Sequence, residues 1–231
     1  MNDTTAYFDA SNPDTPANMT AAIAASDTSG VPTSGTGLTG AAYAPGTSIW
    51  NIDKAAEAAA GTADATFEIT ELFFRNNKSD TTVAEFLGEY GTITSGDGNV
   101  EMGPSALTFS GYIYIPEGVH QISIISDDGF DLNIGGVDFS EFANGRGTDE
   151  TARVAEFDGG LYPIDLLYFD AGGGMSLRME IDGLPVDQSA LYQSVEDFTN
   201  PPADVPIIPI DEYHPSFVLG EESFDVAVNS T

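Results

Sequence analysis

Residues 106–134 read ALTFSGYIYIPEGVHQISIISDDGFDLNI, and this stretch decides the fold class. It contains two long runs rich in β-branched and aromatic residues, Ala106–Pro116 and Val119–Ser126, a composition typical of β-strands. Glu117 and Gly118 separate the two runs and, with the preceding proline, form a short turn signal. The two runs are therefore expected to pair as a hairpin.

The second run alternates apolar and polar residues. His120, Ile122 and Ile124 fall on one face of it, because successive side chains of a strand point to opposite sides. This pattern favours a packed role for His120, and His214 is the only other histidine of the chain. A Ser-His-Asp triad or a zinc site built from several histidines needs more imidazoles, so we expect no enzyme.

The strand pattern continues downstream. The expected strands are Phe130–Ile134, Val137–Phe142, Ala152–Phe157, Leu161–Phe169 and a last one with Leu177, Met179 and Ile181 on one face. Gly135-Gly136 predicts a hairpin between the first two, and Asp158-Gly159-Gly160 predicts another between the next two. Many short strands with glycine-rich turns and few helices indicate an all-β fold, an antiparallel two-sheet β-sandwich.

Two short helices interrupt the strands. Asp53–Ala60 is rich in alanine, and Thr81–Leu87 is the second helical segment, with either Thr81 or Asp80 as its N-terminal cap. Trp50, the single tryptophan, is expected to anchor the core.

Composition divides the chain into three parts. Residues 1–36 are rich in Thr, Ser, Ala, Asp and Pro and are expected to form a linker or extension, with one helix over 18–25. Residues 37–186 hold the strands and form the predicted domain. Residues 187–231 form a proline-rich extension in which helix and central strand are both disfavoured.

The charge balance excludes some functions. Six Lys and Arg stand against 37 Asp and Glu, for a formal net charge of −31, so nucleic acids and anionic membranes would be repelled. The absence of cysteine excludes disulfides, thiolate metal sites and cysteine nucleophiles. So many carboxylates destabilise a compact state unless salt or bound cations compensate them, and calcium, a hard cation abundant outside cells, suits such oxygen-rich loops.

Two segments at strand ends are candidates for calcium. Ser126-Asp127-Asp128-Gly129 ends one apolar strand, and Asp170 followed by Gly172-Gly173-Gly174 ends another. Two adjacent carboxylates on an extended strand point apart, so Asp127 and Asp128 can share one ion only across a turn or a cis peptide bond, and we expect the cis bond. The alternative for each segment is an ordinary solvated turn or a flexible hairpin.

Four blocks in this sequence resemble successive parts of the protective-antigen (PA14) domain family. They are Gly37–Tyr43, Phe109–Pro116, Ile124–Gly136 and Gly160–Phe169. The resemblance covers residues 37–184 and implies a two-sheet antiparallel sandwich. The acidic, cysteine-free composition is also similar to modules of giant bacterial RTX adhesins, including ice-binding adhesins of marine bacteria.

The resemblance also implies a binding site. In lectin members of the family, such as yeast flocculins and epithelial adhesins, paired aspartates joined by a cis peptide bind calcium, which in turn coordinates adjacent sugar hydroxyls. Carried over, the calcium ligands are Asp127, Asp128, Asp170 and backbone atoms of Gly172, Gly173 and Gly174. The sugar would contact Asp127, Asp128, Gly173 and Gly174.

The expected function is a non-catalytic, calcium-dependent lectin module of a bacterial cell-surface adhesin. Its partners would be glycans with adjacent hydroxyls, of the hexose or fucose type, on other cells, and the module would be an extracellular, monomeric part of a longer chain. Two alternatives remain open at this point: a calcium-stiffened spacer without ligand, and an accessory domain of a glycosidase.

Overall fold

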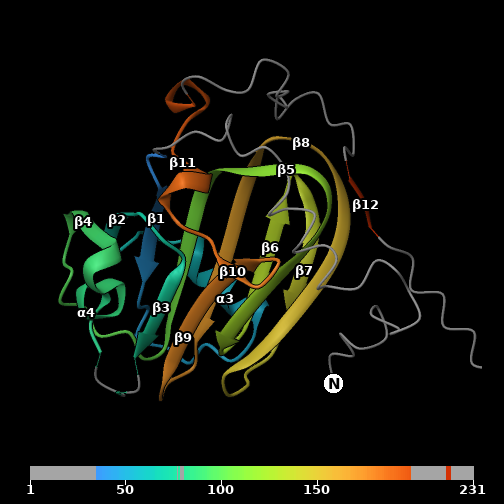
Figure 1. The fold of residues 1–231 in the computed structure, drawn as a ribbon. Coiled ribbons are helices and arrows are strands. Elements are labelled where there is room, and N and C mark those ends of the chain that lie inside the picture. The colour runs from blue at the N-terminus through green and yellow to red at the C-terminus, as the bar shows by residue number, and fades with distance from the viewer. Residues whose placement is uncertain (1–34, 77, 79–80, 199–216, 220–231) are drawn as a thin grey trace, which may run out of the picture.

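Two long antiparallel strands, β5 (Ser105–Asp127) and β8 (Asp149–Asp170), connect the whole molecule. The computed structural model describes residues 35–76, 78 and 81–198, and the backbone of 217–219. β5 and β8 pair from Ser105↔Asp170 to Ser126↔Asp149, and both curve over together between the labels β5 and β8 in Figure 1. Each strand therefore belongs to both layers of the sandwich.

The hairpins predicted within 106–126 and within 152–169 are wrong. Each pair of runs is one continuous strand, and the two predicted turns lie opposite each other, with Glu117 paired to Asp158 and Gly118 paired to Phe157. Gly118 and Gly159 have φ values of 130° and 72°. Glycine and proline in a strand mark bends as well as reversals, and here both strands bend from one sheet into the other.

The first sheet has the strand order β4-β2-β1-β5-β8-β6-β7. Its shorter strands are β1 (Leu38–Tyr43), β2 (Ala65–Ile69), β4 (Gly91–Gly96), β6 (Phe130–Ile134) and β7 (Val137–Phe142). β6 and β7 form the hairpin predicted at Gly135-Gly136, with Ile134 paired to Val137. This sheet uses the first half of β5 and the second half of β8.

The second sheet uses the other halves of β5 and β8. β9 (Met175–Ile181) pairs with the second half of β5, and β3 (Phe73–Asn76) and β10 (Leu184–Pro185) pair with β9. β12 (Phe217–Leu219) pairs with the first half of β8. All these pairings are antiparallel, so the predicted antiparallel β-sandwich is confirmed.

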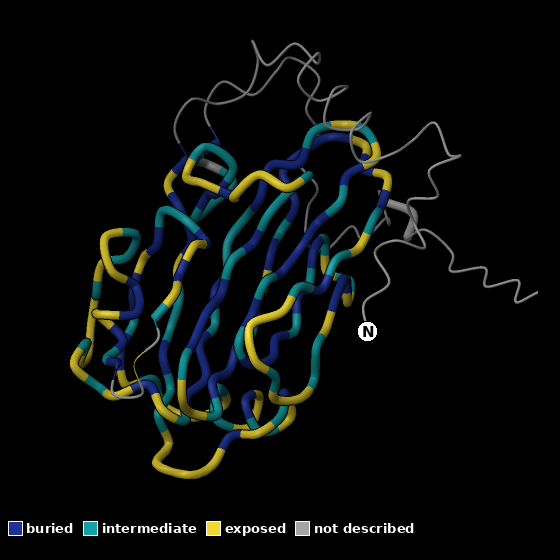
Figure 2. The backbone as a smooth tube through the Cα atoms, turned by 60° about the horizontal axis from the view of Figure 1, so that its bottom comes forward, coloured by how far each residue is buried: buried dark blue, intermediate teal, exposed yellow. Residues whose placement is uncertain are grey.

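The core lies between the two sheets. The inward side chains are the odd-numbered ones at the start of β5 and the even-numbered ones at the end of β8, as in Leu107, Phe109, Tyr162 and Tyr168. The ring of Phe109 lies 5.5 Å from that of Phe67 on β2. Buried residues follow the strands in Figure 2, whereas exposed residues gather in the connecting loops.

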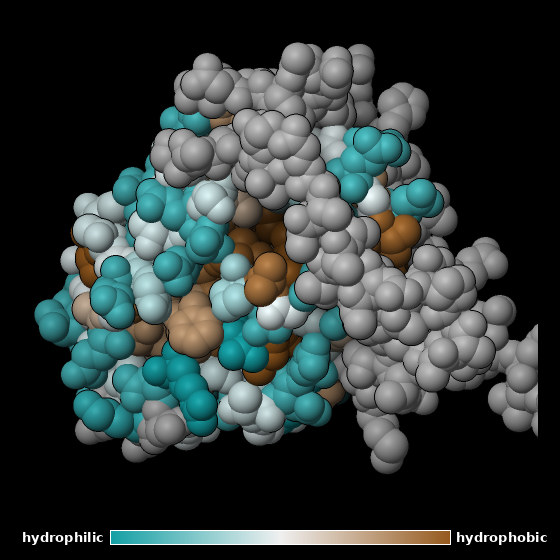
Figure 3. Space-filling view, viewed as in Figure 1, coloured by the Kyte–Doolittle hydropathy of each residue, from teal (hydrophilic) through white to brown (hydrophobic). Residues whose placement is uncertain are grey.

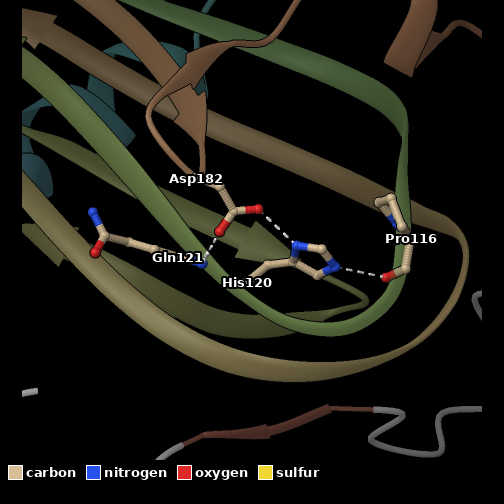
Figure 4. A network of polar contacts seen from close by, with 4 residues as sticks. All are labelled: Pro116, His120, Gln121 and Asp182. Atoms are coloured by element: carbon tan, nitrogen blue, oxygen red, sulfur yellow. Dashed lines mark hydrogen bonds and ion pairs between the residues drawn. The ribbon is translucent and has the colours of Figure 1, made fainter. Parts of the chain in front are cut away.

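His120 is buried on the same face as Ile122 and Ile124, as predicted. Its Nδ1 lies 2.7 Å from Asp182 Oδ2, and its Nε2 lies 3.1 Å from the Pro116 carbonyl oxygen (Figure 4). The backbone N–H of Gln121 donates to the other oxygen of Asp182, at 2.9 Å. This network attaches the β9–β10 turn to the bend of β5, so His120 has a structural role.

Helix α3 (Ile52–Ala59) covers the outer face of the first sheet. Asn51 caps it by accepting a hydrogen bond from the Lys54 N–H, and its buried Ile52 and Ala55 pack with Ala106 and Phe169. Trp50, expected in the core, is 56% exposed. The prediction fails because Ile49 and Ile52, on either side, fill the buried positions.

Helix α4 (Val83–Leu87) closes the space between β3 and β4. Its cap is Thr82, not Asp80 or Thr81, because Glu85 stands three residues later and completes a reciprocal capping box. The Thr81 side chain is instead buried, and its hydroxyl donates to the Lys78 carbonyl. The ring of Phe86 stacks on Tyr168 at 6.0 Å, which joins α4 to the core.

Residues 187–198, expected within the C-terminal extension, pack on the outer face of the first sheet. They contain two 3-10 turns, Gln188–Ala190 and Val195–Asp197, and strand β11 (Leu191–Tyr192), which pairs with β5. Elsewhere in the chain, another 3-10 turn, Gly88–Tyr90, follows α4. Tyr192 and Phe198 form a small cluster with Tyr114. The helix expected over 18–25 and most of the proline-rich stretch lie outside the described residues.

Some apolar side chains of the described residues are exposed on the surface. In Figure 3 apolar side chains appear among hydrophilic ones on the face formed by the second sheet. Two exposed apolar residues of that sheet are Phe73 and Leu184, at 36% and 61% exposure. Among the described residues, none of the helices has the length and apolar character needed to cross a membrane.

Candidate metal and ligand site

Three carboxylates meet where β5 and β8 end. Asp127 is the last residue of β5, Asp128 follows it, and Asp170 is the last residue of β8. Each offers a carboxylate oxygen within 4.8 Å of those of the other two. The Asp127-Asp128 peptide bond is cis, as expected from the sequence. The structure thus brings together the three acidic residues that the sequence analysis selected.

Asp128 is held by backbone N–H groups from two loops. Its Oδ1 accepts a hydrogen bond from the Arg146 N–H at 2.9 Å, and its Oδ2 accepts one from the Ala171 N–H at 2.6 Å. The Ser126 hydroxyl donates to the Asp128 carbonyl at 2.7 Å. The side chain is almost fully buried, so its orientation is fixed before any ligand arrives.

Asp127 is more open than its neighbour. Its Oδ2 accepts a hydrogen bond of 3.3 Å from the Thr148 hydroxyl, and its carbonyl oxygen accepts one from the hydroxyl of Tyr168. Burial and the nearby Asp128 raise the pKa of Asp127, and Thr148 and Arg146 oppose that rise. Two carboxylates in contact favour binding of either a proton or a cation.

Asp170 is the least satisfied group of the site. It is fully buried, and neither of its carboxylate oxygens receives a hydrogen bond of normal geometry from the described residues. Burial, and then the charge of Asp128, raise the pKa of Asp170 to about 7, although the Gly172 backbone acts weakly in the other direction. A buried carboxylate without partners is costly, and a bound cation would remove that cost.

The β8–β9 loop leaves room beside Asp170. Gly172 and Gly173 have φ values of 116° and 114°, which side chains rarely adopt, and a Cβ at either position would meet no atom within 4 Å. Gly172, Gly173 and Gly174 follow Asp170 in the chain, and the space around the first two is open. Their roles as calcium and sugar ligands stay predictions.

The sequence analysis missed the loop between β7 and β8, residues 143–148. It contributes the Arg146 N–H to Asp128 and the Thr148 hydroxyl to Asp127. Tyr168 was predicted only as part of the strand Leu161–Phe169, yet its hydroxyl also reaches the site. Arg146 is one of only six Lys and Arg in the chain, but no local pattern around it indicates a site.

Several solved structures have a fold similar to that of this chain. The PA14 domain of the MpAFP antifreeze protein is 24% identical, with a TM-score of 0.59 over 71% of this chain and 94% of that one. A PA14 sugar-binding domain from an RTX adhesin is 20% identical, with a TM-score of 0.56 over 69% and 99%. The A domain of Epithelial Adhesin 6 from Candida glabrata, solved with Galβ1-3GlcNAc, is 18% identical, with a TM-score of 0.52 over 76% and 94%.

Comparison with family models and with curated proteins gives no match. The structural likeness covers nearly the whole length of the PA14 domains and about seven tenths of this chain. By its fold, the described part of this chain is a PA14-like domain.

Proposed function

We propose that this protein is a calcium-dependent carbohydrate-binding module of a cell-surface adhesin. The observation that carries the proposal is the Asp170 carboxylate, which is fully buried, receives no hydrogen bond of normal geometry from the described residues and lies near Asp127 and Asp128. Three carboxylates this close repel one another unless a cation lies between them. The residues present therefore fit a divalent cation.

The donor set favours calcium over transition metals. The cluster offers carboxylate oxygens, the neighbouring glycine loop is proposed to add backbone carbonyl oxygens, and the chain has no cysteine. Of the two histidines, His120 is engaged in the Asp182 network, and His214 lies outside the described residues. All-oxygen sites with flexible loops suit calcium, whereas zinc prefers nitrogen and sulfur ligands.

The ligand is proposed from the coordination that the protein leaves open. Calcium takes about six to eight oxygen ligands, so when bound here it would accept adjacent hydroxyls of a sugar in addition to the protein's oxygens. The open space at Gly172 and Gly173 leaves an approach for such a ligand. Two similar structures, a PA14 sugar-binding domain and an adhesin domain in complex with Galβ1-3GlcNAc, support this class of ligand.

The protein's own residues orient the site. Arg146 and Ala171 hold the two oxygens of Asp128 through their backbone N–H groups, and Tyr168 holds the Asp127 carbonyl. No described residue supplies an accessible base or nucleophile at this site beyond the three carboxylates, so the proposed role is binding without catalysis. The proposed setting is extracellular, where calcium is abundant and where the adhesins named above act.

A glycan array tests the proposal. Wild-type protein is applied with calcium and with a chelator, beside Asp128→Asn and the matched control Asp158→Asn, which removes an exposed carboxylate at the far bend of β8. Wild type and Asp158→Asn should bind glycans bearing adjacent hydroxyls only with calcium, and Asp128→Asn should bind none. Calcium binding without any glycan signal would instead favour a calcium-stiffened spacer, and binding that survives chelation would contradict the mechanism.

A further inference from the structure

Arg146 is the one cationic side chain that the structure places in contact with the candidate site among the described residues. Its Nη2 donates to the Ser126 hydroxyl at 2.8 Å, and its Nη1 donates to the Thr151 hydroxyl at 2.9 Å. The guanidinium carbon lies 4.2 Å from the centre of the Phe142 ring. These contacts hold the planar group between the ends of β5, β7 and β8.

The side chain and the backbone of Arg146 act on the same residue, Asp128. The backbone N–H donates to Asp128 Oδ1, and Ser126, which accepts from the guanidinium, donates its own hydroxyl to the Asp128 carbonyl. Fixing the side chain therefore fixes the N–H that orients Asp128. The loop also passes very close: a Cβ on Gly145 would lie 3.1 Å from Asp128 Oδ1.

The remainder of the β7–β8 loop has few other attachments. The Ala143 carbonyl accepts the Ile52 N–H at 2.8 Å, and Asn144 bridges to Asn51 at the start of α3. Gly145 and Gly147 lack side chains that could anchor the loop, and the two hydrogen bonds of the Thr148 hydroxyl are long, at 3.3 and 3.4 Å. Arg146 is thus the main link between the middle of the loop and the body of the sandwich.

We propose that Arg146 is a positioning residue that fixes the β7–β8 loop against Asp128 and so prepares the site to bind calcium. The inference rests on the proposed function. It runs against simple electrostatics, because a cation this near to the carboxylates repels a second cation. Charge alone predicts that loss of Arg146 tightens calcium binding, whereas positioning predicts that its loss weakens binding.

Calorimetric titration with calcium separates the two effects. Arg146→Met removes both the charge and the hydrogen bonds, Arg146→Lys keeps the charge but loses the two-pronged geometry, and Thr151→Val keeps arginine but removes one of its acceptors. Arg153→Met is the control, because it removes an exposed positive charge from β8, the strand that follows the loop. Asp128→Asn reports whether the binding that is measured belongs to this site.

Positioning predicts at least a tenfold loss of calcium affinity in both Arg146 variants, about a threefold loss in Thr151→Val, and less than a twofold change in Arg153→Met. Amide hydrogen exchange of residues 143–148, measured without calcium, should be at least tenfold faster in the Arg146 variants, with the exchange of β5 and β8 unchanged. This second readout does not depend on the metal.

Unchanged or tighter binding in Arg146→Met, with binding lost in Asp128→Asn, would overturn the positioning role and leave the proposed site intact. If both Arg146 variants fail to fold, unchanged affinity in Thr151→Val would overturn it. Wild-type protein that binds no calcium, or Asp128→Asn that binds as wild type does, would contradict the proposed function itself.

Discussion

Asp170 is the residue at which burial and charge are most in conflict. It has no exposed surface, its oxygens lack hydrogen-bond donors of normal geometry, and its pKa is raised to about 7, first by burial and then by Asp128. A buried, ionised carboxylate of this kind destabilises the metal-free protein and increases the affinity of the site for a cation. Both consequences can be measured on one variant.

We expect Asp170→Asn to lower calcium affinity at least tenfold and to raise the melting temperature in chelator at pH 8. The amide removes one of three mutually repelling charges and can donate to the remaining carboxylates. Calorimetry and thermal unfolding check the two effects. A variant that keeps wild-type calcium affinity would remove Asp170 from the site.

A second acidic pair, outside the site, shows how neighbouring carboxylates on paired strands reduce the stability of the fold. Asp131 on β6 is paired directly with Glu141 on β7. Burial, followed by the charges of Asp138 and Glu141, raises the pKa of Asp131. Because the pKa in the folded state lies above that in the unfolded state, the ionised carboxylate opposes folding as pH rises through its folded pKa.

Asp131→Asn should therefore stabilise the protein at pH 7 by about 0.2–1 kcal/mol, the range for a cross-strand pair. The gain should vanish near pH 3, where the wild-type carboxyl is protonated in both states. Urea unfolding at the two pH values measures the difference. Equal stability of variant and wild type at pH 7 would show that the pair is fully screened.

At the scale of elements, the bend shared by β5 and β8 determines where the site forms. The bend passes both strands from one sheet to the other, and their far ends bring Asp127 and Asp170 to the same edge. Gly159 makes the bend possible on β8, since its φ is 72° and a Cβ there would lie 2.7 Å from the Glu117 nitrogen.

Gly159→Ala should destabilise the protein by more than about 1 kcal/mol, because alanine fits neither the φ value nor the space. Gly147→Ala is the control: its Cβ would meet no atom within 4 Å, and its φ lies outside the positive range. Chemical denaturation of the two variants gives the comparison. A Gly159→Ala protein as stable as the control would mean that the bend tolerates a side chain.

The elements also show what the sequence could and could not predict. The strands and the buried face with His120 follow from alternation, which depends only on local spacing. The long strands were mistaken for hairpins at Pro116-Glu117-Gly118 and Asp158-Gly159-Gly160. Such glycine-containing segments can either reverse the chain or bend a continuous strand, and which of the two occurs depends on the strand that pairs with them. Arg146 could not be predicted as part of the site, because its contacts join segments that only the folded sheets bring together.

At the scale of the whole molecule, charge sets the conditions for stability. The formal net charge of −31 opposes compaction, and bound calcium and dissolved salt reduce that repulsion in different ways. The proposed calcium site exists only in the folded state, so the stabilisation expected from calcium follows its concentration relative to the dissociation constant.

Chelation should lower the melting temperature by roughly 5–10 °C relative to calcium at 100 times its dissociation constant, since that ratio corresponds to about 2.7 kcal/mol. Sodium chloride should restore part of the loss by screening the surface charge. Thermal scans in calcium, in chelator and in chelator with salt check this. Identical curves in calcium and chelator would leave no occupied site.

The most direct test of the central claim is a crystal structure of the protein grown with calcium and a bound glycan from the array, with the ion identified by anomalous scattering. We expect one calcium ion within about 2.3–2.6 Å of carboxylate oxygens of Asp127, Asp128 and Asp170, with two adjacent sugar hydroxyls completing its coordination. A glycan bound elsewhere, or calcium absent from these three carboxylates at a saturating concentration, would contradict the account.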